Sequence, residues 1–151
     1  MLAALPLAAC GYTPAYAPGG KVADLFGRVE TEAPSNDSEF ELVARIEERL
    51  GRPTDAAYAL DYDIATRQFD LAVTRVNAIT RYNVEGEATF RLTDKATGKA
   101  LSEGKLNTFT SYAASGTTVA TDAAKTDAYR RLMRLLADQI VTRIAADLSA
   151  P

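Results

Sequence analysis

Few side chains in this sequence could carry out covalent or acid/base chemistry. Its 151 residues include one cysteine, Cys10, and no histidine, so the commonest general base and the commonest metal ligand are both missing. One thiolate cannot build a zinc site of the usual Cys/His type. Carboxylate pairs such as Glu47 and Glu48 could transfer protons, but they fall in a stretch of helical periodicity, where a solvated face is the commoner role. The sequence therefore predicts a protein that is not an enzyme and has neither a metal site nor a cofactor.

Cys10 follows an uncharged apolar run, Met1 to Ala9, which has the pattern of the hydrophobic part and cleavage end of an export signal. The residues Leu7-Ala8-Ala9-Cys10 resemble the bacterial lipobox, in which the cysteine is acylated and becomes the first residue of the mature chain. Each buried acyl methylene contributes about 0.8 kcal/mol, and two or more chains anchor a protein stably. We therefore expect residues 1–9 to be a signal-peptide remnant and Cys10 to carry lipid. The alternative is that Cys10 is a small apolar residue of a frayed terminus.

The remainder of the chain has the composition of a folded domain. It is 47% apolar and 25% charged, which is typical of globular proteins. The net charge of -3 argues against a nucleic-acid partner, because affinity for that polyanion comes mostly from clustered Lys and Arg. Residues 11–20 contain two prolines and three glycines, so residues 10–20 are predicted to be an extended lipidated tether. Residues 21–151 are then expected to form a single α+β domain.

The first half of this domain predicts a strand, a helix and a second strand. A short strand is expected around Leu25 to Val29. Ser38 and Glu41 have the spacing of a capping box, so a helix should begin there and end at Gly51. Its apolar face has helical spacing and comprises Leu42, Val43, Ile46 and Leu50. The next strand, Tyr58 to Ile64, alternates apolar and polar residues and is followed by a polar break at Thr66 to Gln68.

The second half predicts a long hairpin and a long helix. Strands are expected from Leu71 to Thr93 and from Lys99 to Tyr112, joined by a loop over Asp94 to Gly98. If Thr93 opposes Lys99, Glu87 faces Lys105, a pair of opposite charges that favours this register.

Apolar residues at every fourth position then predict a helix from Thr121 to about Leu148. A helical crossover between the first two strands implies parallel pairing or near neighbours, and the hairpins imply antiparallel pairing afterwards. The expected fold is an α+β two-layer sandwich, in which a four-stranded mixed sheet carries two helices on one face, in the order β-α-β-β-β-α.

The order of several short motifs resembles one known family. They are Leu7-Ala8-Ala9-Cys10-Gly11-Tyr12 with Pro14 and Tyr16, Thr80-Arg81-Tyr82, the turn from Asp94 to Gly98 with Gly104, Ser111-Tyr112, and Ala128, Leu136-Ala137-Asp138 and Ile140 near the end. In this order they resemble the lipopolysaccharide-assembly outer-membrane lipoproteins, LptE, of the alphaproteobacterial type.

The resemblance implies an outer-membrane lipoprotein that plugs the lumen of the LptD β-barrel from the periplasmic side and contacts lipopolysaccharide. Two other interpretations stay open. One is a periplasm-facing adaptor lipoprotein of another envelope transport system, and the other is an envelope hydrolase built on carboxylates.

One face of the predicted hairpin carries the residues that could make such contacts. Cations occur there at Arg75, Arg81, Arg91, Lys95, Lys99 and Lys105, and guanidinium groups bind phosphate bidentately. These cations are candidates for lipopolysaccharide contact, and the alternative is that they pair with Glu85, Glu87 and Glu103 on a solvated face. Three apolar residues, Ile79, Leu101 and Phe109, interrupt the charges and are candidates for a partner interface.

Overall fold

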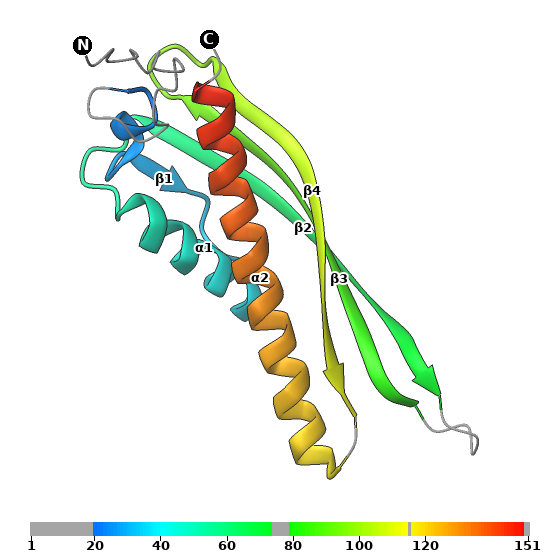
Figure 1. The fold of residues 1–151 in the computed structure, drawn as a ribbon. Helices are drawn as coiled ribbons and strands as arrows, with labels where there is room; N and C mark the ends of the chain where they lie inside the picture. Colours follow the sequence, from blue (N-terminus) through cyan, green and yellow to red (C-terminus); the bar gives the residue numbers. More distant parts are fainter. Residues whose placement is uncertain (1–19, 74–78, 115, 150–151) are drawn as a thin grey trace, which may run out of the picture.

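A four-stranded sheet with the strand order β1-β2-β3-β4 forms one layer of the molecule. The computed structural model describes residues 20–73, 79–114 and 116–149. The strands are β1 (Val29–Thr31), β2 (Tyr58–Val73), β3 (Ile79–Asp94) and β4 (Ala100–Ala113). Two helices, α1 (Asp37–Leu50) and α2 (Thr118–Ser149), cover one face of the sheet (Figure 1). β1 runs parallel to β2, and the other pairs are antiparallel. The predicted α+β class and element order are confirmed.

The core lies between β3 and the two helices. The even-numbered residues of β3 from Val84 to Leu92 are buried, as the apolar alternation predicts. The helices contribute fully buried Leu42 and Ile46 from α1 and Leu132 and Leu136 from α2. α2 packs closely on β3, because a Cβ placed on Gly86 would lie 2.9 Å from Leu132 Cδ2. Burial of these side chains from water is the main source of stability.

The chain before α1 differs from the prediction. Residues Ala23–Leu25 form a 3-10 helix, which buries Leu25, and β1 starts only at Val29. Gly27 adopts a positive φ of 69° between the two elements, and its N–H donates to Leu50 O at 2.7 Å. The predicted strand from Leu25 to Val29 is therefore wrong, because the turn at Gly27 directs the chain away from the sheet.

The N-cap of α1 lies two residues before the predicted one, Ser38. Asn36 is the N-cap, and its side-chain oxygen accepts from Glu39 N–H at 3.0 Å. The Glu39 carboxylate in turn accepts from Ser35 N–H at 2.7 Å. The expected pair of Ser38 and Glu41 is wrong, since Glu41 instead contacts α2 through Arg130 at 3.1 Å.

β2 is one continuous strand that passes through the predicted break. Thr66 to Gln68 pair with β3 in regular register. Residues 65–71 of β2 are solvent-exposed on both faces. The polar residues in this stretch therefore indicate an exposed strand and not a turn. The predicted strand from Leu71 to Thr93 is correspondingly two strands, β2 ending at Val73 and β3 beginning at Ile79.

The β3–β4 hairpin has the predicted strands in a different register. Thr93 pairs with Ala100 and Glu87 with Asn107, because the register shifts between Leu92 and Thr93. From Leu92 back to Arg81 the shift is two residues, which keeps the side chains of β4 from Ser102 onward on their predicted faces. The ion pair between Glu87 and Lys105 still forms at 2.7 Å, as a diagonal contact.

α2 begins three residues earlier than Thr121, at Thr118. The hydroxyl oxygen of Thr117 accepts from Ala120 N–H at 3.3 Å and so caps the first turn. None of the described helices is both long and apolar enough to cross a membrane. Cys10, the signal remnant and nearly all of the predicted tether lie outside the described residues.

Candidate functional site

The outer face of the sheet, opposite the helices, carries three of the cations that the sequence singles out, Arg81, Arg91 and Lys105. Arg91 stands in β3 between Asp61 of β2 and Glu103 of β4, and its guanidinium lies 2.9 Å from the Glu103 carboxylate. Lys105 lies 2.7 Å from Glu87. The carboxylates on neighbouring strands therefore compensate much of the positive charge at the centre of this face.

The remaining cations are spread along the strands. Arg81 is exposed near the start of β3, ten residues before Arg91, a distance of about 33 Å in an extended strand. Lys95 and Lys99 belong to the turn at the other end, where Lys95 lies 2.7 Å from Glu30 and Lys99 is exposed. Arg75 lies outside the described residues. The five cations that the structure describes therefore do not meet in one cluster.

The structure describes the surroundings of two of the three apolar candidates, and they differ. Phe109 is 66% exposed on the outer face, as the alternation of β4 predicts. Leu101 is half-buried and packs against the core, because the β3–β4 register shift removes it from the outer face; its assignment to that face is wrong. Ile79 is the first residue of β3.

Phe69 is an outer-face residue that the sequence interpretation missed. It is 42% exposed and stands in β2 opposite Asn83. The guanidinium carbon of Arg67 lies 5.9 Å from the Phe69 ring centroid, a cation–π distance. The signal was present in the alternation of Ala65, Arg67 and Phe69, and the assumption of a break at Thr66 to Gln68 concealed it.

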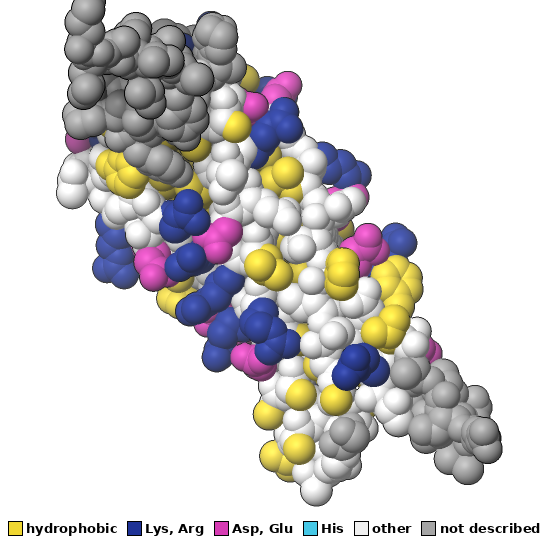
Figure 2. All heavy atoms as spheres, viewed as in Figure 1, with side chains coloured by type: hydrophobic (Ala, Val, Ile, Leu, Met, Phe, Trp, Pro, Cys, Tyr) yellow, Lys and Arg dark blue, Asp and Glu magenta, His cyan; other side chains and the backbone are white. Residues whose placement is uncertain are grey.

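The helix side of the molecule is also rich in arginine, but there the charges join α1 to α2. Figure 2 shows Lys and Arg side chains gathered among acidic ones over this side. Asp138 of α2 accepts from Arg45 Nε at 3.0 Å and from Arg49 at 2.7 Å. Burial alone would raise the pKa of Asp138, but these hydrogen bonds outweigh it and hold the pKa below its usual value. This cluster is structural.

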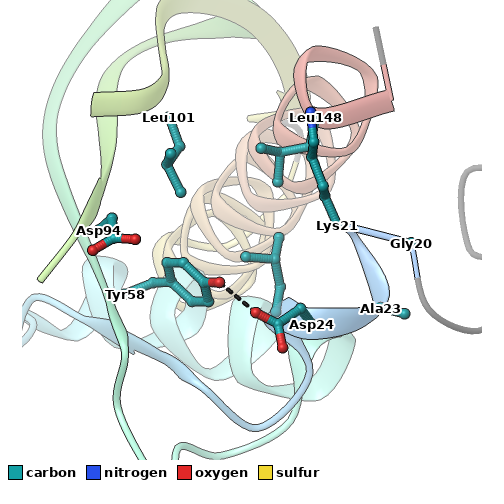
Figure 3. A pocket seen from close by; sticks show the side chains of 9 residues that line it. Gly20, Lys21, Ala23, Asp24, Tyr58, Asp94, Leu101 and Leu148 are labelled. Atoms are coloured by element: carbon teal, nitrogen blue, oxygen red, sulfur yellow. Dashed lines mark hydrogen bonds between the residues drawn. The ribbon is translucent and has the colours of Figure 1, made fainter. Parts of the chain in front are cut away.

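A pocket of about 570 Å³ lies where the described chain begins, between the 3-10 helix, the β3–β4 turn and the end of α2 (Figure 3). Leu101 and Leu148 form its apolar side. Tyr58 donates its hydroxyl hydrogen to Asp24, which lowers the pKa of that carboxyl.

The second acid of this pocket is also engaged. Asp94 accepts from the N–H groups of Ala96 and Thr97, each at 2.9 Å, and the bond from Thr97 lowers the pKa of Asp94. Both acids are therefore held in their charged form by hydrogen bonds that shape the pocket. Neither has the raised pKa that favours a general acid near neutral pH.

The described residues form a small two-layer α+β protein with a broad, open sheet face. Residues 26–144 match the model of one family, LptE, described as lipopolysaccharide-assembly, and the chain belongs to this family. The family match extends from the end of the 3-10 helix into the last turns of α2.

Solved lipoprotein structures share this fold. A Caulobacter crescentus CB15 protein described as a lipoprotein is 21% identical, with a TM-score of 0.71 over 86% of this chain and 97% of that one. The rare lipoprotein B of Shewanella oneidensis is 14% identical, with a TM-score of 0.60 over 79% and 92%. The minor lipoprotein of Acinetobacter baumannii is 20% identical, with a TM-score of 0.58 over 80% and 90%. Comparison with curated protein sequences gives no match.

Proposed function

We infer that this protein is an outer-membrane lipoprotein that assembles with the LptD β-barrel, plugs its lumen and assists the transport of lipopolysaccharide to the cell surface. Membership of the lipopolysaccharide-assembly family, over residues 26–144, is the observation that carries the inference. Acylated Cys10 would anchor the chain in the outer membrane, and residues 10–20 would tether the domain on the periplasmic side. The protein would act by binding and not by catalysis.

The outer sheet face has the properties of a large, wet interface. Its charges are compensated mostly within the face, as in the pair of Arg91 and Glu103, so a polar wall can cover it without leaving many unpaired charges. Phe109 and Phe69 add isolated apolar contacts. Interfaces of this type combine apolar anchors with a polar, hydrated surround. A barrel lumen lined with polar side chains is a suitable partner.

Contact with lipopolysaccharide would use the cations that keep free charge. Among the described residues, neither Arg81 nor Lys99 is part of a salt bridge, whereas Arg91 and Lys105 are already paired. Charge reversal of Arg81 and Lys99 together should therefore weaken binding of lipopolysaccharide by the purified protein more than reversal of Arg91 and Lys105. Equal effects, or none with an intact fold, would exclude these cations as the contact.

Co-purification tests the assembly itself. The tagged lipoprotein, extracted from membranes in mild detergent, should bring down a β-barrel protein. Phe109→Asp should reduce that yield, while Asn107→Asp, a matched change two residues away on the same exposed face, should not.

Cys10→Ser should release the chain from the membrane fraction, and depletion should leave the cell surface short of lipopolysaccharide. Recovery without a barrel, from membranes that contain one, would favour the adaptor interpretation.

A further inference from the structure

Among the described residues, β2 has an open edge along most of its length. On one side it pairs with β3, but on the other it pairs with β1 only from Tyr58 to Leu60. Tyr58 N–H donates to Arg28 O and Leu60 O accepts from Glu32 N–H, so the even-numbered residues of β2 direct their backbone groups towards the β1 side. Within the described chain this pairing ends at Leu60, and β2 continues beside β3 with its other edge uncovered (Figure 1).

The side chains beside this edge do little to block it. Residues 65–69 are exposed on both faces of the sheet, and none of the described helices covers them. Backbone N–H and C=O groups that lie unpaired along an edge are a template for another strand. Those of Tyr62, Ile64, Thr66 and Gln68 face this edge.

We propose that a second copy of this chain pairs with the edge, antiparallel, about a two-fold axis that passes beside Ala65. In this register Ile64 of each copy exchanges both backbone hydrogen bonds with Thr66 of the other, as the direction of the backbone groups requires. On the outer face, Asp63 of each copy stands opposite Arg67 of the other. Both side chains are exposed, and neither is in a salt bridge with any residue that the structure describes.

Neighbouring registers fit less well. An axis at Ile64 would pair Leu60 with Gln68, but Leu60 O already accepts from Glu32 N–H. An axis at Thr66 would remove both pairs of opposite charge, because Asp63 would then face Phe69. The register about Ala65 leaves β1 intact and matches both charges. Symmetric association of this kind is self-complementary.

The pairing should be weak and reversible. It joins one strand segment of nine residues, Asp61 to Phe69, from each copy, which is less than the roughly 1,600 Å² of a standard stable interface. The association is independent of the barrel partner proposed above, so the purified protein alone can test it.

Disulfide trapping tests the register. The whole chain carrying Cys10→Ser has no thiol, so Ala65→Cys introduces one. Two Ala65 residues would face each other in a non-hydrogen-bonded pair with Cα atoms about 4.5 Å apart, within disulfide range. Mild oxidation should give a covalent dimer, whereas Asn107→Cys, equally exposed in β4, should stay largely monomeric. Equal crosslinking of the two variants would overturn the proposal.

Charge exchange tests the pairing without a covalent bond. In sedimentation equilibrium, Asp63→Arg or Arg67→Asp in the Cys10→Ser chain should each lower the association constant roughly tenfold, because two like-charge pairs replace two attractive ones. The double variant should restore it, since the charges are complementary again. A chain that stays monomeric at every concentration, or a double variant no better than the single ones, would refute self-association through this edge.

Discussion

Replacing Gly86 with alanine should destabilise the domain, because α2 leaves almost no space for a side chain at this position of β3. The added Cβ would lie 2.9 Å from Leu132 Cδ2 and 3.1 Å from Leu136 Cδ1. Both leucines are fully buried, so neither can turn into solvent to make room. Overpacking of this kind costs about 1–3 kcal/mol, while alanine regains about 0.5–1 kcal/mol of backbone entropy. The expected net loss is about 1–2 kcal/mol.

Urea denaturation of the wild type and the Gly86→Ala variant measures this loss as a lower midpoint at unchanged slope. Gly104→Ala is the matched control, because its Cβ would meet Phe90 Cε1 at 3.3 Å, and it should cost less. Adding Leu132→Ala should abolish the penalty of Gly86→Ala, since the cavity accepts the new methyl group. A Gly86→Ala variant as stable as the wild type, or strictly additive losses in the double variant, would refute this account of the packing.

Three further changes test the polar contacts by denaturation. Asp138→Asn should lower the free energy of unfolding by about 1 kcal/mol at neutral pH, and the control Glu48→Gln, at an exposed residue, should lower it by less. The pKa of Asp138 in the folded protein is lowered from 3.8. The stability difference between wild type and Asp138→Asn should therefore vanish as the pH falls through that lowered pKa. Tyr62→Phe should be neutral or stabilising, because the buried Tyr62 hydroxyl has no partner among the described residues, whereas Tyr112→Phe loses a hydrogen bond. The pKa of Tyr62 is raised from 10.0 to about 12, so the wild type should lose more stability than Tyr62→Phe as the pH rises between those values. Asn36→Ala should cost about 1 kcal/mol in helix capping.

The sequence predicts the elements of this fold because their periodicity is strong. Apolar spacing in α1 and α2 and alternation in β3 each survive in the structure. The boundaries were less predictable where two local signals compete, as with Asn36 and Ser38, which are both good caps. The ion pair of Glu41 with Arg130 of α2 shows that Glu41 does not complete a capping box with Ser38. The polar stretch at Thr66 to Gln68 predicted a break because a sequence does not tell which part of a strand a helix covers.

The candidate site was predictable to a smaller extent. Exposure of Phe109 follows from alternation alone, and the fold confirms that position. Pairing of Arg91 with Glu103 depends on which residues oppose each other across two strands, and the hairpin is shifted by two residues from the predicted register. Such a shift preserves faces, so the pattern that defines the core carries little information about individual charge partners.

The uneven cover of β2 has an evolutionary consequence. Leu60, near the start of β2, is fully buried in the core. Substitutions there change a packed volume and destabilise the domain. Residues 65–69 border solvent on both sides, and their replacement leaves the core volume unchanged. One strand therefore holds both a segment constrained by folding and a segment that the core does not constrain. Substitutions in the second segment can change the surface at this end of the domain without repacking the scaffold.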